Sequence, residues 1–487
     1  MAFRTTRADP RTQGFNSTPR REISYELAMK LPRSERVDAR EGLLLGSWRG
    51  PSRLLCAAAL LHFVLAVALY EVGRRAAFPN VIDEHGVVTA VAPDAADFRE
   101  QAALLSGALR SGEVRYWLGS DYSFHVKLYS VCYALFGPLI GYNVLAAESL
   151  NLMLYLACLA LVFSLGREVS SHRAGLIAAG AVALWPSFVL HSTQLLKDPL
   201  FVPLFLGLVL ILARLLTRTY TLAKVLPMGA AGAAVIVALC LTRSNWRWLL
   251  VAIVLVGALM LAIRQFKERQ VLVANFACVL LLLAAVVSLP YVMPNALKLG
   301  LENDRPKAVD DSSRLRLAPT EGSRRGHIWT RASAQVGDLR RGLAASSPDS
   351  GSDIGAEVRI EDASDLVTYL PRAAAIGFFA PFPNMWLTAG KHSGLVGRRL
   401  AGVESLAIYA VEALAFLGLW QGRRRLGVWL LASVAAMGIT TLGLVLVNVG
   451  ALYRMRNAFL ALLIIVAAGA VAGMIQGDGR RRSDAMR

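Results

Sequence analysis

Residues 198–216 read DPLFVPLFLGLVLILARLL, an apolar run whose only charged residues are Asp198 at its start and Arg214 near its end. A helix of this length is long enough to cross the hydrocarbon core of a bilayer. Comparable runs recur along the 487 residues, of which 55% are hydrophobic and 18% charged, with a mean hydropathy of +0.48. Soluble domains carry about 25% charged residues. The sequence therefore predicts an all-α, polytopic helical membrane protein.

The apolar runs predict about ten spans between a basic, polar segment 1–52 and a basic tail 476–487. The transmembrane module occupies 53–475, and no cleavable signal peptide is expected because the first apolar run begins too late in the chain. The predicted spans are 53–73, 143–165, 173–190, 198–216, 225–242, 247–264, 271–292, 402–420, 427–447 and 457–475.

The net charge of +18 would suggest nucleic acid in a soluble protein, but here it is better explained by membrane topology. If the N-terminus is cytoplasmic, the short inner segments after residue 52, with the C-terminal tail, hold fifteen Lys and Arg residues, and the short outer turns hold five. Lys and Arg collect on cytoplasmic loops. We therefore expect both termini in the cytoplasm, a bilayer as partner and no nucleic acid. The five cysteines lie in apolar stretches without metal-ligand spacing, which is typical of core residues.

Two long segments, 74–142 and 293–401, then face the outer side. In the first, Pro93 is suited to the first turn of a helix, and apolar residues follow at helical spacing, which predicts an amphipathic surface helix. A second helix is expected over 124–136, ahead of a turn at FGPLIG. In the second segment, 301–365 is polar enough to predict a flexible cap. The prolines beyond residue 366 predict a broken re-entrant or interfacial element.

Acidic residues of the first outer segment are candidates for a general base. Asp94 and Asp97 lie in PDAADFREQA, residues 93–102, and Asp83 and Glu84 lie in VIDEHG. Acids in the first turn of a helix also suit its dipole, and an Asp-Glu pair near a membrane is often only solvated. A carboxylate at the outer surface can instead deprotonate an acceptor hydroxyl.

Cations on the short outer turns are the second group of candidates. Any one of them can be a side chain that extends to lipid headgroups, but three turns on one face favour a shared phosphate site. The residues are Lys197, Arg243, Arg247, Arg454 and Arg456, with Arg372 as a weaker member. His62 and Glu412 are ionisable residues within spans, and His191 and Asp198 flank Lys197 and are expected to order that turn.

These motifs resemble the GT-C glycosyltransferases, in particular the group of protein O-mannosyltransferases and the lipid A aminoarabinose transferase. The first outer loop of that group often has an Asp, an aromatic residue four positions on and an alanine eight positions on, places that Asp94, Phe98 and Ala102 fill here. LFG at 135–137, Asn151, GRE at 166–168, VALWPSFVLHS at 182–192, PFPNMW at 381–386 and YRMR at 453–456 extend the resemblance over most of 53–475.

The resemblance implies Asp94 as the base and a sugar on a polyprenyl phosphate as donor. Transfer would proceed with inversion on the periplasmic face of a bacterial inner membrane, without a required divalent metal or other cofactor, to a glycan, lipid or protein acceptor. The sequence departs from the family where Ala95 follows Asp94, and where FHVKLY replaces a lysine-proline-proline motif. His125 or Lys127 would then take the role of the phosphate-binding lysine.

Two other functions remain open at this point. A polysaccharide polymerase or ligase would also use outer arginines and a lipid-linked oligosaccharide. A lipid or sugar transporter is less favoured, because no internal repeat is evident.

Overall fold

The computed structural model describes residues 33–293, 328–346, 353–387 and 394–485. The chain divides into two units, Met1–Leu54 and Leu55–Arg487, and the second contains the helical bundle. The described backbone is helical apart from its connecting loops and one antiparallel bridge between Asp353 and Asn448. The helices are α2 (Arg33–Arg74), α3 (Asp94–Arg110), α4 (Val114–Gly119), α5 (Phe124–Ile140), α6 (Val144–Val169), α7 (His172–Ala183), α8 (Pro186–Ser192), α9 (Asp198–Thr217), α10 (Leu222–Thr242), η1 (Ser244–Trp246), α11 (Arg247–Glu268), α12 (Val273–Val292), α16 (Ile328–Ser346), α17 (Ala363–Phe379), η2 (Pro383–Met385), α18 (Gly394–Gln421), α19 (Leu426–Val445), α20 (Val449–Met455) and α21 (Asn457–Ala485).

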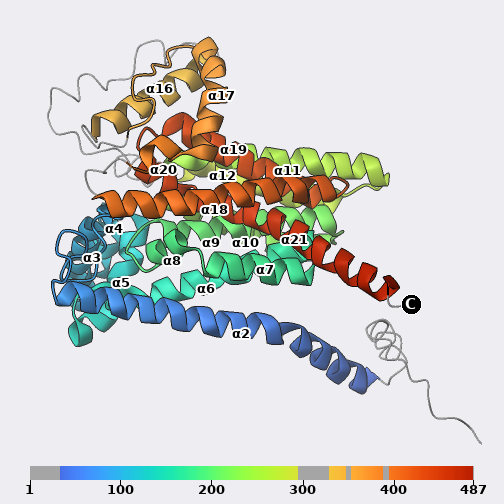
Figure 1. The fold of residues 1–487 in the computed structure, drawn as a ribbon, viewed down its shortest axis with the longest axis horizontal. Helices are drawn as coiled ribbons and strands as arrows, with labels where there is room; N and C mark the ends of the chain where they lie inside the picture. The colour runs from blue at the N-terminus through green and yellow to red at the C-terminus, as the bar shows by residue number, and fades with distance from the viewer. Residues whose placement is uncertain (1–32, 294–327, 347–352, 388–393, 486–487) are drawn as a thin grey trace, which may run out of the picture. The chain divides into compact units, whose positions relative to one another are not determined.

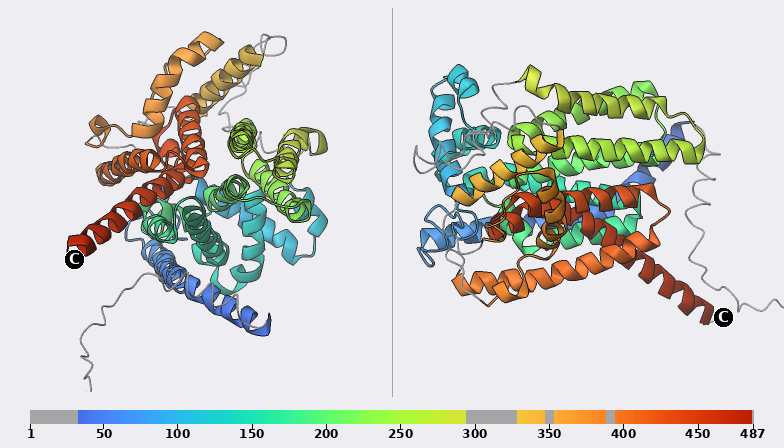
Figure 2. Two further views of the ribbon diagram at one scale, coloured as in Figure 1. Left: turned by 90° about the vertical axis from the view of Figure 1, so that its right-hand side faces the viewer. Right: turned by 90° about the horizontal axis from the view of Figure 1, so that it is seen from above.

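The described residues include nine helices that are long and apolar enough to cross a membrane, and a bent helix pair raises the number to ten if it counts as one span. This confirms the prediction of a multi-pass helical membrane protein. Helix α9, which contains the run that opened the sequence analysis, contacts α6, α10, α11, α19 and α21 (Figure 2). The spans of α9 and α21 are the most buried ones, so these two helices form the centre of the bundle.

The predicted span 173–190 is not one continuous helix. It consists of α7 and α8, which meet at an angle of 67°. The break lies at Trp185, which is extended (φ −75°, ψ 113°), and Pro186 is the first residue of α8. A proline disfavours the helical conformation of the residue before it and is well suited to a helix start. The proline therefore ends α7 and redirects the chain, so that the segment after α8 turns back toward α3 and α5.

Segment 74–142 contains helices α3, α4 and α5, of which α3 and α5 pack together, and the prediction of an amphipathic helix beginning at Pro93 is correct. Pro93 is the N-cap of α3, and α5 extends past the expected 124–136 to Ile140, so the expected turn at FGPLIG begins later and Pro138 lies within the helix. The two helices pack through an apolar cluster that also takes in the loop after α8. Its buried residues are Val87, Ala92, Ala95, Ala102, Val126, Tyr129, Tyr133, Val144, Ala146, Ala147, Leu195 and Leu196.

Figure 1 shows that α3, α4 and α5 lie at one end of the bundle, which we call the α3 end, and that the C-terminal end of α21 lies at the opposite one. The loop after α8 is held at the α3 end by buried hydrogen bonds. The side chain of Gln194 accepts from the backbone N–H of Val88 at 3.0 Å, and the hydroxyl of Tyr129 donates to the backbone oxygens of Gln194 and Leu196 at 3.4 Å. These contacts fix the backbone immediately before Lys197 and Asp198.

The second outer segment is more ordered than its composition suggested. Residues 301–327 lie outside the described ranges, but Ile328–Ser346 forms α16, which packs on α17 and α19. Arg340 of α16 donates to the backbone oxygens of Leu444 and Gly355 at 2.5 and 2.6 Å. Pro371 does not break α17, contrary to expectation, whereas the chain does leave the helix before Pro381. Membrane proteins tolerate a proline inside a helix where neighbouring groups satisfy the backbone.

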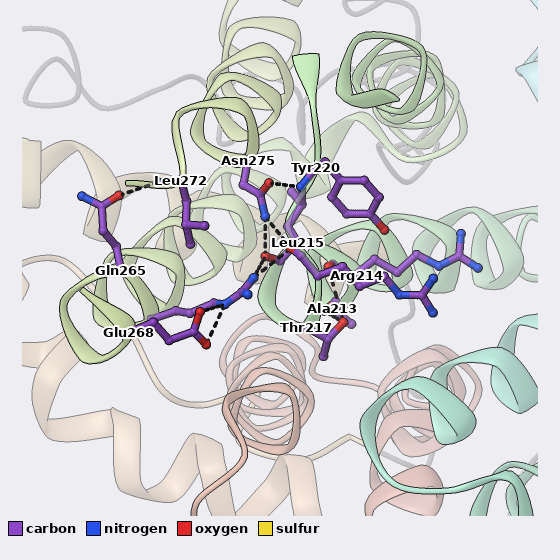
Figure 3. A network of polar contacts seen from close by, with 11 residues as sticks. Ala213, Arg214, Leu215, Thr217, Tyr220, Gln265, Glu268, Leu272 and Asn275 are labelled. Atoms are coloured by element: carbon purple, nitrogen blue, oxygen red, sulfur yellow. Dashed lines mark hydrogen bonds and ion pairs between the residues drawn. The ribbon is translucent and has the colours of Figure 1, made fainter. Parts of the chain in front are cut away.

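At the end opposite α3, the last turn of α9 is capped by side chains from two other helices (Figure 3). The amide nitrogen of Asn275 donates to the carbonyl oxygens of Leu215 and Arg218, both at 2.8 Å. The amide oxygen of Asn275 accepts from the backbone N–H of Tyr220 at 3.2 Å. Arg264 donates to the same two carbonyls and to Glu268. The free carbonyls that every helix end presents are thereby satisfied.

Replacing Asn275 with Ala should lower the free energy of unfolding by about 1–3 kcal/mol, because the N–H of Tyr220 loses its acceptor and the carbonyls of Leu215 and Arg218 keep only Arg264. Thermal unfolding of the protein in detergent micelles measures the change. The exposed neighbour Gln270→Ala is the control and should stay within about 0.5 kcal/mol of the wild type. Equal melting temperatures for the two variants would contradict the capping role of Asn275.

Candidate functional site

Four charged side chains from distant parts of the sequence form a continuous chain of ion pairs, which we call the ion cluster. Asp94 Oδ2, at the start of α3, accepts a hydrogen bond from Arg454 Nη2 of α20 at 3.0 Å. Arg454 Nε lies 3.3 Å from Asp198 Oδ2, at the start of α9. Asp198 Oδ1 accepts from Arg243 Nη2, which follows α10, at 2.8 Å. The cluster thus joins the first outer segment to three separate turns.

The ion cluster runs from the protein interior to the surface. The side chains of Arg243, Asp198 and Arg454 are 10%, 12% and 14% exposed, whereas that of Asp94 is 52% exposed. A solute can therefore reach the carboxylate of Asp94. The buried part keeps its charges in surroundings where electrostatic attraction is stronger than in water. Asp94 is thus the accessible carboxylate at one end of a group of otherwise buried charged side chains.

Arg454 is held in its charged form. Burial alone would lower the pKa of Arg454, but the carboxylates of Asp198 and Asp94 outweigh burial and raise it. Lys197, next to Asp198, places its Nζ 5.8 Å from the centre of the Phe98 ring. Three cations (Lys197, Arg243 and Arg454) and two carboxylates (Asp94 and Asp198) thus gather in one region. Arginine matches the oxygens of a phosphate or carboxylate.

His125 lies beside this cluster in an unusual state for a buried polar residue. It is 1% exposed, its ring stands edge-on to Phe98 with centroids 4.4 Å apart, and neither ring nitrogen has a hydrogen-bond partner among the described residues. Burial, with help from the charges of Lys197 and Arg243, lowers the pKa of His125 well below its usual value. The imidazole is therefore neutral at pH 7 and still has one donor and one acceptor to offer.

The other acidic candidates are placed differently. Asp83 accepts from the backbone N–H groups of His85 and Val87 at 2.9 and 2.8 Å, which orders its own loop. Glu84 is 81% exposed and lies 3.5 Å from His85. Asp97 is exposed, one turn beyond Asp94 on α3. Of the four acids singled out from the sequence, only Asp94 contacts a cation of the outer turns.

The remaining cationic candidates also separate from the ion cluster. Arg372 of α17 pairs with Glu357 at 2.8 Å. Lys127 of α5 donates to the backbone oxygen of Leu118 at 2.8 Å. Arg247 lies over the ring of Trp248, 4.3 Å from its centre. Arg456 is fully buried, and its Nη1 donates to the carbonyl oxygens of Gly377, Phe378 and Ala380 at the end of α17. These contacts assign Arg456 to the packing of α17 rather than to the anion site expected from YRMR.

Asp198 is the residue whose importance the sequence understated. An acid followed by a proline is typical of a helix start, and we expected Asp198 only to order the turn at Lys197. In the structure it is the shared counter-ion of two arginines. Within the described ranges no three His, Cys, Asp or Glu side chains gather closely enough to hold a metal ion. Arg454 occupies the space between the carboxylates of Asp94 and Asp198.

No protein-family model and no curated protein sequence matches the chain. Among solved structures, it is similar to the Archaeoglobus fulgidus oligosaccharyltransferase in the apo form, with 12% identity and a TM-score of 0.46 over 90% of this chain and 52% of that chain. It is also similar to the archaeal oligosaccharyltransferase AglB from Archaeoglobus fulgidus in complex with an inhibitory peptide and a dolichol-phosphate, with 14% identity and a TM-score of 0.46 over 88% of this chain and 51% of that chain. The chain spans about half the length of these structures.

The neutral state of His125 predicts a pH-dependent stability. Because the pKa of His125 is lowered in the folded protein, the unfolded chain binds a proton below about pH 6.5 that the folded protein does not, so acid favours unfolding. Stability should fall by up to about 1.4 kcal/mol per pH unit below that value. Melting curves between pH 7.5 and 5.5 measure this fall. It should be smaller in His125→Leu, and an equal fall in both proteins would contradict a buried neutral imidazole.

Replacing Arg456 with Gln should destabilise the protein by about 1–3 kcal/mol, since three buried carbonyl groups lose a charged donor. The control is Arg247→Gln, which removes only a partly exposed contact with Trp248 and should lose about 1 kcal/mol or less. Denaturation in detergent measures both. If Arg247→Gln proved the more damaging substitution, the packing role of Arg456 would be wrong.

Proposed function

We propose that the chain is an inverting membrane glycosyltransferase of the GT-C type, which moves a sugar from a polyprenyl-phosphate donor to an acceptor. The contact between Asp94 and Arg454 carries the proposal, because it places a solvent-accessible carboxylate beside a group of cations. These are the two components that such a transfer requires: a base for the acceptor and a receptor for the departing phosphate. The match of Asp94, Phe98 and Ala102 to the first-loop pattern of the family supports the same assignment.

In this mechanism, the carboxylate of Asp94 takes the proton of an acceptor hydroxyl. The acceptor oxygen forms a bond with the anomeric carbon of the donor sugar while the bond from that carbon to the phosphate oxygen breaks. The lipid phosphate leaves with the electron pair of the broken bond, so its negative charge grows. A single displacement from the face opposite the leaving group inverts the configuration at the anomeric carbon.

The cations act on the leaving group. Arg454 contacts Asp94 at the surface end of the ion cluster, Arg243 pairs with Asp198, and Lys197 lies 5.8 Å from the centre of the Phe98 ring. Fixed charges in a buried site stabilise a developing anion without having to reorganise. Neutral His125 can add one hydrogen bond to a phosphate oxygen without adding charge. In this proposal the site needs no divalent metal, because guanidinium and ammonium groups neutralise the phosphate.

Arg454 also links donor binding to the activity of the base. Its guanidinium is hydrogen-bonded to Asp94 in the structure. A donor phosphate would compete for that group and release the carboxylate for the acceptor hydroxyl. The donor would therefore bind before the base becomes fully available, which disfavours unproductive proton transfer.

The proposal places the α3 end of the bundle on the outer, periplasmic side of a bacterial inner membrane, with both termini in the cytoplasm. The excess of Lys and Arg on the opposite set of segments, fifteen against five, supports this orientation. The lipid tail of the donor would lie along the bundle in the bilayer, with its phosphate at the ion cluster.

Asp94→Asn should lower the rate of transfer by about 10²–10⁴-fold, because it removes the base while keeping the shape of the side chain. Transfer from a short-chain polyprenyl-phosphate sugar, assayed with the full-length protein in nanodiscs, measures this. Asp97→Asn is the matched control, since Asp97 lies one turn away on the same helix, and it should remain active. An active Asp94→Asn enzyme would overturn the assignment.

The same assay separates the proposal from a polysaccharide polymerase or ligase. The Arg-rich composition of the ion cluster is the observation that keeps this alternative open. Under it, activity would be lost in Arg243→Ala and Arg454→Ala but kept in Asp94→Asn. Loss in all three variants favours the glycosyltransferase.

A further inference from the structure

A cavity of about 600 Å³ lies beside α3, and no step of the proposed transfer uses it. Its lining comes from one residue of α3 and from the short α4 with the loop that follows. The described residues that line it are Gln101, Tyr116, Gly119, Ser120, Asp121 and Tyr122. The volume falls within the usual range of small-molecule sites.

The lining has a definite chemical character. Its described residues combine two tyrosine rings with an amide, a hydroxyl and a carboxylate, and none of them is a cation or has an aliphatic side chain. A phosphate favours cations and a lipid tail favours aliphatic groups, so these described residues suit neither. Flat aromatic faces pack against the C–H faces of sugar rings, while amide and carboxylate groups bond to their hydroxyls. A neutral carbohydrate fits this combination.

Hydrogen bonds between α4 and α5 and within α4 fix the walls of the cavity. Trp117 of α4 donates from its ring nitrogen to Ser130 of α5 at 2.8 Å. Lys127 of α5 donates to the backbone oxygen of Leu118 at 2.8 Å, and Ser120 donates to that of Trp117 at 2.8 Å. These bonds hold α4 against α5. A binding site with fixed walls loses less entropy when a ligand enters.

The cavity lies in line with the proposed base. Gln101 follows Asp94 by seven residues on α3, and seven residues make nearly two helical turns, so both side chains project from similar faces about 10 Å apart. A short chain of sugar units that occupies the cavity can therefore extend along α3 and bring its terminal hydroxyl to Asp94.

We propose that this cavity is the acceptor site and that the acceptor is a neutral, polyhydroxylated glycan chain. This inference rests on the proposed function, which left the acceptor open among glycan, lipid and protein. The tyrosines Tyr116 and Tyr122 stack on the sugar rings, and Gln101 and Asp121 bond to the hydroxyls. The glycan is thus held at the α3 surface, while the donor phosphate binds at the ion cluster.

A glycine offers a direct way to fill the cavity. A Cβ atom added at Gly119 would meet nothing within 4 Å, and the same holds for Gly107 on α3, which is not among the lining residues. Gly119→Leu therefore adds its bulk from a Cβ that stands in open space at the cavity, and Gly107→Leu is its matched control. Neither glycine has a positive φ, so neither substitution strains the backbone. Tyr116→Ala provides a second variant, which removes an aromatic face instead of adding bulk.

Binding is measured by saturation-transfer-difference NMR on the full-length protein in nanodiscs, with maltotetraose, mannotetraose and chitotetraose as probes and a Ser/Thr-rich peptide as comparison. We expect at least one oligosaccharide to bind to the wild type, Asp94→Asn and Gly107→Leu. Its affinity should fall about tenfold in Gly119→Leu and Tyr116→Ala, as expected for the loss of one good contact. Binding of the peptide alone, of none of the probes, or with equal affinity to all variants would overturn the inference.

Binding to Asp94→Asn keeps the two proposals separable, since this variant lacks the proposed base but keeps the cavity. Inactive wild-type protein, or active Asp94→Asn protein, counts against the glycosyltransferase and leaves the binding result intact. An active wild type, an inactive Asp94→Asn variant and unchanged glycan binding in Gly119→Leu count against the acceptor site alone.

Discussion

The double ion pair of Arg454 is the interaction on which the arrangement of the site depends. One guanidinium group contacts Asp94 of α3 and Asp198 of α9, residues that are 360 and 256 positions earlier in the chain. Arg243 completes the charge balance of Asp198. Removing one partner of the buried Arg454–Asp198 pair leaves an uncompensated charge and is strongly destabilising, whereas Asp94 is half exposed. The geometry of the α3 end is therefore specified by electrostatics as well as by apolar packing.

Apolar packing determines where the charged groups can meet. The apolar cluster joins α3, α5 and the loop after α8. Helix α3 begins at Asp94, α5 begins next to His125, and the loop ends at Lys197. Ala95 and Ala102 are fully buried on α3, whereas Asp94, about 100° around the helix from Ala95, lies beside this buried face and is exposed. Leu195 and Leu196 are buried in the same cluster, directly before Lys197 and Asp198. One hydrophobic core thus positions both the accessible acid and part of its cationic surroundings.

The sequence predicts the helices of this protein better than it predicts their partners. Long apolar runs have few alternatives to membrane-spanning helices, and Pro93 and the apolar spacing of 98–109 were sufficient to locate α3. Pro371 was misleading, because a packed helix tolerates a proline that an isolated one would not. The composition of 328–346 did not reveal α16, whose Arg340 contacts backbone oxygens that lie far away in the sequence. Arg454 and Arg456 are two residues apart, and only the fold shows that one faces Asp94 and the other the end of α17.

The buried contact of His62 has a consequence for how the bundle assembles. His62 of α2 is fully buried, its two ring nitrogens lie 2.7 Å from Glu148 of α6 and 2.9 Å from Ser192 of α8, and its ring stacks on Tyr155. These partners follow it by 86 and 130 residues, so they are synthesised and inserted later. A polar group without partners is unfavourable in lipid. Helix α2 therefore enters the bilayer with a polar side chain whose hydrogen-bond partners on α6 and α8 are not yet there. Packing of α2 against these later helices is a step that has to follow their insertion.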